Sequence, residues 1–160
     1  MHTTPSRYAR TDGLDAVADD IAPVAEETQR LRNTLRLNAV TSFSGGLAAT
    51  AAGGTVARLL GTGHPGWVRL IGVGLCLFAV GVLTVAASRF SKLVRWAPII
   101  SILDAGWVLA SAATMVLGWY SPTGQATVAL VALMVAWLGT RQMRLSRSIG
   151  RPVWPARTVQ

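Results

Sequence analysis

Residues 67–88 read WVRLIGVGLCLFAVGVLTVAAS, and this stretch decides the fold class of the protein. Its only charged residue is Arg69, close to its start. An α-helix rises about 1.5 Å per residue and the hydrocarbon core of a bilayer is about 30 Å thick, so about 20 apolar residues cross it. The stretch therefore predicts a transmembrane helix.

Three further stretches are long and apolar enough for the same prediction: 37–59, 97–119 and 123–140. The first is rich in Thr, Ser and Gly, yet we expect a helix because backbone groups in lipid must be hydrogen-bonded within the protein. Turn residues separate the first two spans at Gly61, Gly63, Pro65 and Gly66, and the last two at Ser121, Pro122 and Gly124. We expect an all-α polytopic membrane protein whose four helices form two hairpins in a compact bundle.

The composition agrees with a membrane protein. Of 160 residues, 51% are hydrophobic and 14% are charged, whereas about a quarter of the residues are charged in an ordinary soluble domain. The formal net charge of +8 could indicate nucleic-acid binding, but the basic residues lie in short clusters beside apolar stretches. We therefore expect anionic lipid head groups, and not nucleic acid, as their partners.

Arginine and lysine are unevenly distributed over the predicted loops, and basic loops tend to stay cytoplasmic. One side carries Arg30, Arg32 and Arg36, then Arg89, Lys92 and Arg95, then Arg141, Arg144, Arg147, Arg151 and Arg157. The other side carries only Arg58 and Arg69 near its span ends. We expect both termini in the cytoplasm, and the bias toward Ala, Gly, Val and Arg favours the plasma membrane of a bacterium.

Three parts of the chain follow: a polar N-terminal arm (1–36), the bundle (37–140) and a basic tail (141–160). The arm has six acidic and no basic residues from Asp12 to Glu27. It is expected to be partly disordered, or else to form a short helix, interrupted at Pro23, that docks on the tail. In the tail, Arg141, Arg144, Arg147 and Arg151 are expected to contact anionic head groups.

Small residues in the first span form two ridges, because residues four apart share a helix face. Gly45, Ala49 and Gly53 make up one ridge, and Gly46, Thr50 and Gly54 make up the other. Such ridges let helix backbones approach each other in lipid. They predict close packing of the first span against another span, or against a second copy or a partner helix.

Asp104 is the only acidic residue in any predicted span. It lies about seven residues into the third span, or about 10 Å deep, and should face the bundle interior. Polar residues at comparable depth could bond it: Asn38, Thr41, Ser42, Ser44 and Thr84. Two interpretations stay open, a proton or cation site and a structural hydrogen bond that positions the first and third spans.

Other chemistry lacks the residues it needs. Cys76 is the only cysteine, and the two histidines, His2 and His64, lie outside the predicted spans. A disulfide, a thiolate metal site, bis-histidine haem ligation and a carboxylate pair for two-metal catalysis are therefore not expected. We expect a protein that is not an enzyme and that has neither metal nor cofactor.

The sequence stretches LRLNAVTSFSGGL, ARLLG, VRLIGVGLCLFAVGVL, LDAGWVLAS and LGWYSPTGQATVALVAL lie between about residues 35 and 135. Together they resemble a group of small bacterial four-span membrane proteins without an established activity, which show Asn followed by Ser-x-Ser-Gly in span one and Asp-x-x-Trp-Val in span three. The resemblance implies a shared role for six residues: Asn38, Ser42, Ser44, Gly45, Asp104 and Trp107.

Two hypotheses of function follow. The first is an accessory or scaffold subunit of a membrane complex or homo-oligomer. The second is a small proton- or cation-coupled transporter that uses Asp104. In outline it is similar to the small multidrug resistance transporters, but their carboxylate lies in span one and Asp104 lies in span three. A DoxX-like protein is a third possibility, on which no residue match bears.

Overall fold

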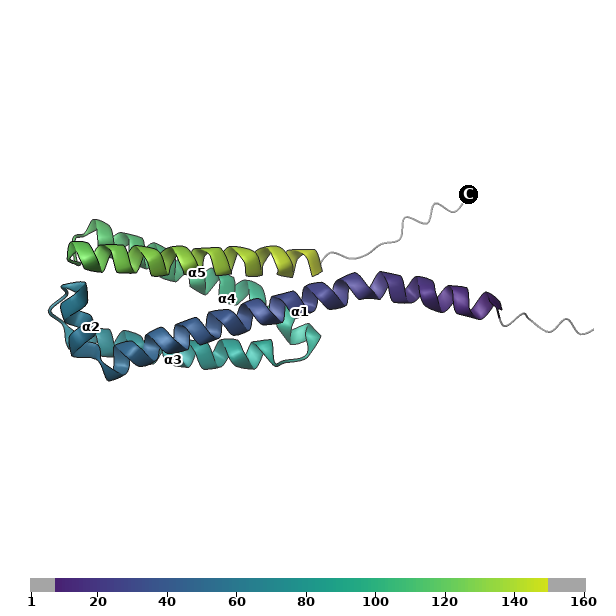
Figure 1. Cartoon of the computed structure of the whole chain (residues 1–160), viewed down its shortest axis with the longest axis horizontal. Helices are drawn as coiled ribbons and strands as arrows, with labels where there is room; N and C mark the ends of the chain where they lie inside the picture. The colour runs from purple at the N-terminus through teal and green to yellow at the C-terminus, as the bar shows by residue number, and fades with distance from the viewer. Residues whose placement is uncertain (1–7, 150–160) are drawn as a thin grey trace, which may run out of the picture.

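A computed structural model describes residues 8–149, with side chains described from residue 22 onward. These residues form five α-helices and no strand (Figure 1), which confirms the all-α prediction. The helices are α1 (Tyr8–Ala51), α2 (Gly53–Leu60), α3 (Pro65–Ala86), α4 (Phe90–Val116) and α5 (Pro122–Ile149).

Three of these helices, α3, α4 and α5, are long and apolar enough to cross a membrane. They cover most of the predicted spans 67–88, 97–119 and 123–140. In the most apolar window of each helix only 22–28% of the residues are buried, so Leu, Val, Ile and Trp side chains point outward. An outward apolar surface of this extent supports a membrane protein with transmembrane helices.

The first predicted span, 37–59, is not a single helix. Helix α1 ends at Ala51, and α2 begins at Gly53. Two backbone bonds bridge the break, from Ala52 N–H to the Ala48 carbonyl and from Val56 N–H to the Ala52 carbonyl, each 2.9 Å long. The prediction of an uninterrupted helix was wrong because the Gly53–Gly54 pair has little preference for helical backbone, and kinks occur at such pairs.

Helix α1 begins well before the predicted bundle. It starts at Tyr8 and contains Pro23, so the expected interruption at Pro23 does not occur. Beyond this proline, the Arg30 guanidinium bonds the Glu26 carboxylate one turn earlier at 2.6 Å. Leu31 and Leu35 are fully buried. The packed part of the chain therefore begins before residue 36, where the arm was expected to end.

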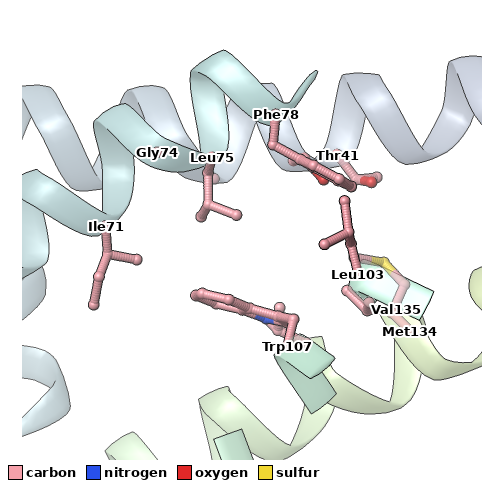
Figure 2. A pocket seen from close by; sticks show the side chains of 12 residues that line it. Thr41, Ile71, Gly74, Leu75, Phe78, Leu103, Trp107, Met134 and Val135 are labelled. Atoms are coloured by element: carbon pink, nitrogen blue, oxygen red, sulfur yellow. The ribbon is translucent and has the colours of Figure 1, made fainter. Parts of the chain in front are cut away.

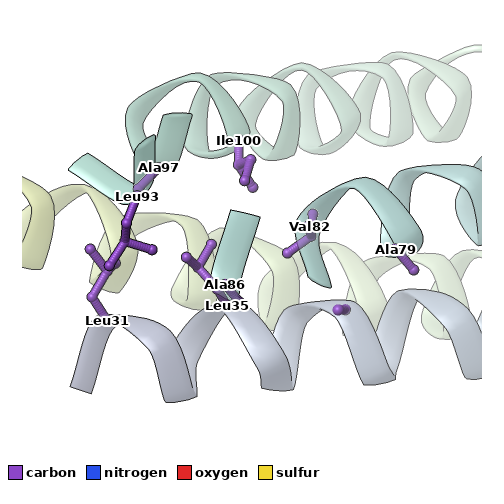
Figure 3. Packing of buried hydrophobic residues seen from close by; sticks show 9 residues of the cluster. Leu31, Leu35, Ala79, Val82, Ala86, Leu93, Ala97 and Ile100 are labelled. Carbon is purple, nitrogen blue, oxygen red and sulfur yellow. The ribbon is translucent and has the colours of Figure 1, made fainter. Parts of the chain in front are cut away.

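A cluster of buried apolar side chains from α1, α3 and α4 forms the core (Figure 3). Its members are Leu31, Leu35, Ala39, Ala79, Val82, Ala86, Leu93, Ala97 and Ile100. Leu145 and Ile149, at the end of α5, pack against the same cluster. The α3–α4 turn and the end of α5 lie at this end of the bundle, and α1 continues beyond it (Figure 1).

Helix α3 packs along α1, and α4 packs along α5, whereas α3 and α4 touch each other little. The first pair meets at glycines. A Cβ atom on Gly46 would lie 2.7 Å from the Gly72 carbonyl oxygen, and one on Gly72 would lie 2.6 Å from Thr50 Oγ1. The ridge of Gly46 and Thr50 thus packs within the chain.

The other predicted ridge residues have different surroundings. Gly53 lies against the Arg69 side chain, whereas Gly45 and Gly54 have no neighbouring atom within 4 Å of an added Cβ. Ala49 is half-buried. Within the described residues, Gly45 and Gly54 therefore make no close helix contact, and packing of these two residues against a second copy or a partner helix stays a prediction.

Candidate functional site

Asp104 and Asn38 form a buried hydrogen bond between two helices. Asn38 Nδ2 on α1 donates to Asp104 Oδ2 on α4 at 2.9 Å. Asn38 is 0% exposed and Asp104 is 3% exposed. Because a polar group buried without a partner is costly, this bond both satisfies the carboxyl and holds α1 against α4.

The bond extends into a small polar layer on α1. Ser42 Oγ lies one turn beyond Asn38 and donates to Asn38 Oδ1 at 3.4 Å. Thr41 Oγ1 bonds the carbonyls of Leu37 and Asn38, both at 3.0 Å. The Asn38 amide therefore accepts from Ser42 with its oxygen and donates to Asp104 with its nitrogen.

Helix α5 approaches Asp104 closely at a glycine. A Cβ atom on Gly139 would lie 3.2 Å from Asp104 Cβ and 3.6 Å from Oδ2. A larger residue would push α5 away from the carboxyl. Sequence reasoning missed Gly139, although a glycine within an apolar span indicates a close helix contact.

A groove between α4 and α5 reaches Asp104. Its volume is about 480 Å³, and its walls include Ser101, Val108 and Val135. Arg144 and Arg147 line it toward the end of α5. Asp104 is thus covered by Asn38 on the side of α1 and contributes the edge of its side chain to a groove on the opposite side.

Three predicted residues do not join this layer. Ser44 is exposed, since it lies two residues and so about 200° around the helix from Ser42. Thr84 is also exposed and bonds the Gly81 carbonyl at 2.7 Å. Thr84 sits on α3 and lines the groove between α3 and α4, whereas Asp104 lines the groove between α4 and α5. The prediction from depth alone was wrong for both residues because depth does not specify the helix face or the neighbouring helix.

Trp107 is the third predicted residue that lies outside the polar layer. It is half-buried on α4 and faces a cavity of about 330 Å³ (Figure 2). All four long helices contribute to the lining, including Thr41, Ser42 and Gly45 from α1 and Leu75 and Phe78 from α3. Most of the lining is apolar. The edge of the α1 polar layer therefore reaches this cavity, but Asp104 does not.

No family model, curated protein or solved structure matches this chain.

A buried glutamine lies near the end of α5, within the predicted tail. Gln142 is 0% exposed, and neither of its side-chain amide atoms has a hydrogen-bond partner among the described residues. Its position was missed because it stands among arginines. The spacing could have indicated its burial, because Leu138 and Ser146 lie four residues before and after it on the same helix face. Both of these residues are buried.

The arginines around Gln142 are exposed. Arg141, Arg144 and Arg147 all lie on the helical extension of α5. The Arg141 guanidinium stacks 5.4 Å from the ring centroid of Trp137. Arg151, the fourth residue predicted to contact head groups, lies outside the described residues.

A second polar contact fastens α1 to the end of α3. The Arg32 guanidinium donates to the Ala86 carbonyl at 2.5 Å and to the Ser88 carbonyl at 2.8 Å. Carbonyls at a helix C-terminus lack intrahelical partners and carry partial negative charge. Arg32 therefore supplies both hydrogen bonds and charge at this terminus.

Metal-binding groups do not gather in the part of the chain that the structure describes. No three His, Cys, Asp or Glu side chains of that part lie close enough together to hold an ion. Cys76 is half-buried, with its Sγ 4.0 Å from the Phe43 carbonyl oxygen. The polar layer around Asp104 is the strongest candidate site in these residues.

Proposed function

We propose that this chain is a non-enzymatic multi-pass membrane protein that serves as an accessory or scaffold subunit. The four spans would be α3, α4, α5 and a first span made of the second half of α1 together with α2. The outward apolar faces of α3, α4 and α5 support this assignment. The backbone bonds across Ala52 support a kinked first span, because backbone groups in lipid need internal partners.

The proposed topology places both termini in the cytoplasm of a bacterium, with the plasma membrane as the location. Lys92 and Arg95 near the start of α4 and Arg144 and Arg147 near the end of α5 are exposed. Figure 1 shows that these two helix ends lie at the same end of the bundle. Anionic head groups are the partners proposed for this end. Membership in the group of small four-span bacterial proteins belongs to the same proposal.

The observation that carries the scaffold role is the buried bond between Asn38 and Asp104. The only acidic residue of the proposed spans uses one carboxyl oxygen to hold α1 against α4 at 2.9 Å. A bond of this kind positions helices and does not require a substrate. It leaves the outer surfaces of the bundle free for a partner membrane protein or for a second copy.

Topology can be tested by labelling single cysteines in a Cys76→Ala background. His64→Cys lies in the α2–α3 turn, and Ser148→Cys lies near the end of α5; both positions are exposed. In intact cells, an impermeant maleimide should label the first variant only, and permeabilisation should expose the second. Labelling of Ser148→Cys in intact cells would contradict cytoplasmic termini.

The scaffold role can be tested by determining the mass of the complex in mild detergent. Affinity-purified protein should elute as a homo-oligomer or with one partner protein in fixed stoichiometry, and reciprocal tagging should recover the same complex. A monomer that purifies without any stoichiometric partner from native membranes would overturn the scaffold role.

The groove at Asp104 favours a second candidate, a transporter coupled to protons or cations. Asp104 forms part of the wall of this groove, as a site that exchanges a proton with a solute pathway would require. Asp104→Asn should then abolish solute flux in proteoliposomes while the protein keeps its fold. Unchanged flux with reduced thermal stability would contradict the transporter and agree with the structural role.

A further inference from the structure

The groove between α3 and α4 has a different character from the groove at Asp104. Its volume is about 460 Å³. Gly81 and Val85 of α3 and Ile99 and Ile100 of α4 form apolar walls. The groove exists because α3 packs on α1 and α4 packs on α5, so these two consecutive helices touch little.

The shape of this groove fits an extended chain better than a helix. One turn of α-helix, about 5.4 Å long and about 10 Å wide, already occupies about 420 Å³. The α3 residues that line the groove run from Phe78 to Ser88, and ten steps of about 1.5 Å make about 15 Å. That length is half of a bilayer core of about 30 Å, the reach of one acyl chain.

The polar groups of the groove lie toward the end where the head groups of the proposed membrane would be, with Thr84 four residues before Ser88. Lys92 and Ser88 line that end, and no acidic side chain lines any part of the groove. Behind Ser88, the Arg32 guanidinium bonds the Ser88 carbonyl at 2.8 Å. Lys92 thus places a cationic side chain at one end of an apolar groove, and Arg32 bonds the backbone of Ser88 at that end.

Trp96 lines the same groove one turn beyond Lys92. Tryptophan favours the interface between head groups and acyl chains. The far end of the groove reaches Phe78 and Leu103, which also line the cavity between the four helices (Figure 2). The groove is therefore cationic, then aromatic, then apolar, in the order that a phospholipid presents a phosphate, a glycerol ester and a tail.

We infer that the α3–α4 groove binds one phospholipid with an anionic head group. The phosphate lies at Lys92, and one acyl chain follows Gly81 and Ile99 toward Phe78. This inference rests on the proposed membrane embedding. It adds a specific lipid between two helices that otherwise touch little.

The test is native mass spectrometry of the purified full chain in micelles that contain equal amounts of phosphatidylglycerol and phosphatidylcholine. We expect one phosphatidylglycerol per chain in preference to phosphatidylcholine. Lys92→Gln should lower phosphatidylglycerol binding about tenfold, as expected for the loss of one charge-assisted hydrogen bond. Arg95→Gln, on the same helix but outside the groove, should leave binding unchanged.

A second pair of variants tests the apolar part without altering charge. A Cβ atom on Gly81 or on Gly106 would meet no atom within 4 Å, so a leucine side chain starts in open space at both positions. Only Gly81 lines the groove. Gly81→Leu should therefore displace the acyl chain and reduce lipid binding, whereas Gly106→Leu should bind lipid like the parent protein.

Three results would overturn the inference. They are equal binding of both lipids, no effect of Lys92→Gln, and an effect of Gly81→Leu on oligomeric state without an effect on bound lipid. The third result would indicate that the groove between α3 and α4 binds a second copy of the chain instead of a lipid. Alkaline carbonate extraction of the parent protein provides a separate readout, because release from membranes would contradict the proposed embedding itself.

Discussion

Helix α3 has a closed face and an open face, and both contain glycine. Toward α1, a Cβ on Gly72 would come within 2.7 Å of backbone atoms of Gly46 and Thr50. Toward α4, a Cβ on Gly81 would meet nothing within 4 Å. The residue type is the same at both positions, so the opposing helix decides whether a glycine closes an interface. Four substitutions, each with a matched control, test this difference and the other contacts between the helices.

The largest effect is expected at the closed face. Gly72→Leu should lower the free energy of unfolding by about 3 kcal/mol, because the added side chain meets backbone that can yield only if the helices separate. Gly74→Leu is the matched control, since its added Cβ has open space. Chemical unfolding in detergent micelles measures both. Equal stability of the two variants would contradict the difference between the faces.

The next effect concerns the bond that joins α1 to α4. Asn38→Ala removes the donor to Asp104 and should cost about 1–2 kcal/mol, in the range of interhelical hydrogen bonds in membranes. Ser44→Ala, at an exposed position of the same helix, should leave the unfolding transition unchanged. If Asn38→Ala is neutral, the packing of α4 on α5, and not this bond, positions Asp104.

A smaller effect of opposite sign is expected on α5. Gln142→Leu should raise the free energy of unfolding by about 1 kcal/mol, because it removes one buried amide group whose nitrogen and oxygen have no partner among the described residues. Gln125→Leu, at an exposed position, serves as the control. A lower midpoint for Gln142→Leu would contradict this expectation and would indicate that the amide binds a group of its own.

The smallest effect is expected where α1 is fastened to the end of α3. Arg32→Gln should cost about 0.5–1 kcal/mol, because it weakens bonds to the Ala86 and Ser88 carbonyls at a helix C-terminus. Arg36→Gln changes charge equally at an exposed position and should be close to neutral. The difference between the two midpoints measures how much this contact adds to the closed face of α3.

Part of the candidate site could be predicted from local sequence. Asp104 stands alone as an acid among apolar residues, and Asn38 lies at comparable depth in the neighbouring segment, so their pairing was among the predicted options. Ser44 and Thr84 lie at the same predicted depth, but neither of them bonds Asp104. Depth along a helix follows from the number of residues, but the direction of a side chain toward a neighbour also depends on how the helices pack.

The boundaries of the first helix were less predictable. The interruption at Ala52 follows from two glycines whose low helix propensity can be overridden by lipid. At Pro23 the helix continues instead of ending, because a proline removes one hydrogen bond and need not end a long helix. In both places opposing effects of similar size compete, and composition does not decide between them.

The all-helical class, three apolar helices able to cross a bilayer, and Asp104 as the one acid among them could all be predicted from the amino-acid sequence. Length, hydropathy and residue type are local properties, so they can be read without neighbours. Three features required the folded structure: the bond from Asn38 to Asp104, the contact of Gly72 with α1 while Gly81 has open space, and the burial of Gln142. Each depends on which surface lies opposite, and that is set by the packing of all the helices together.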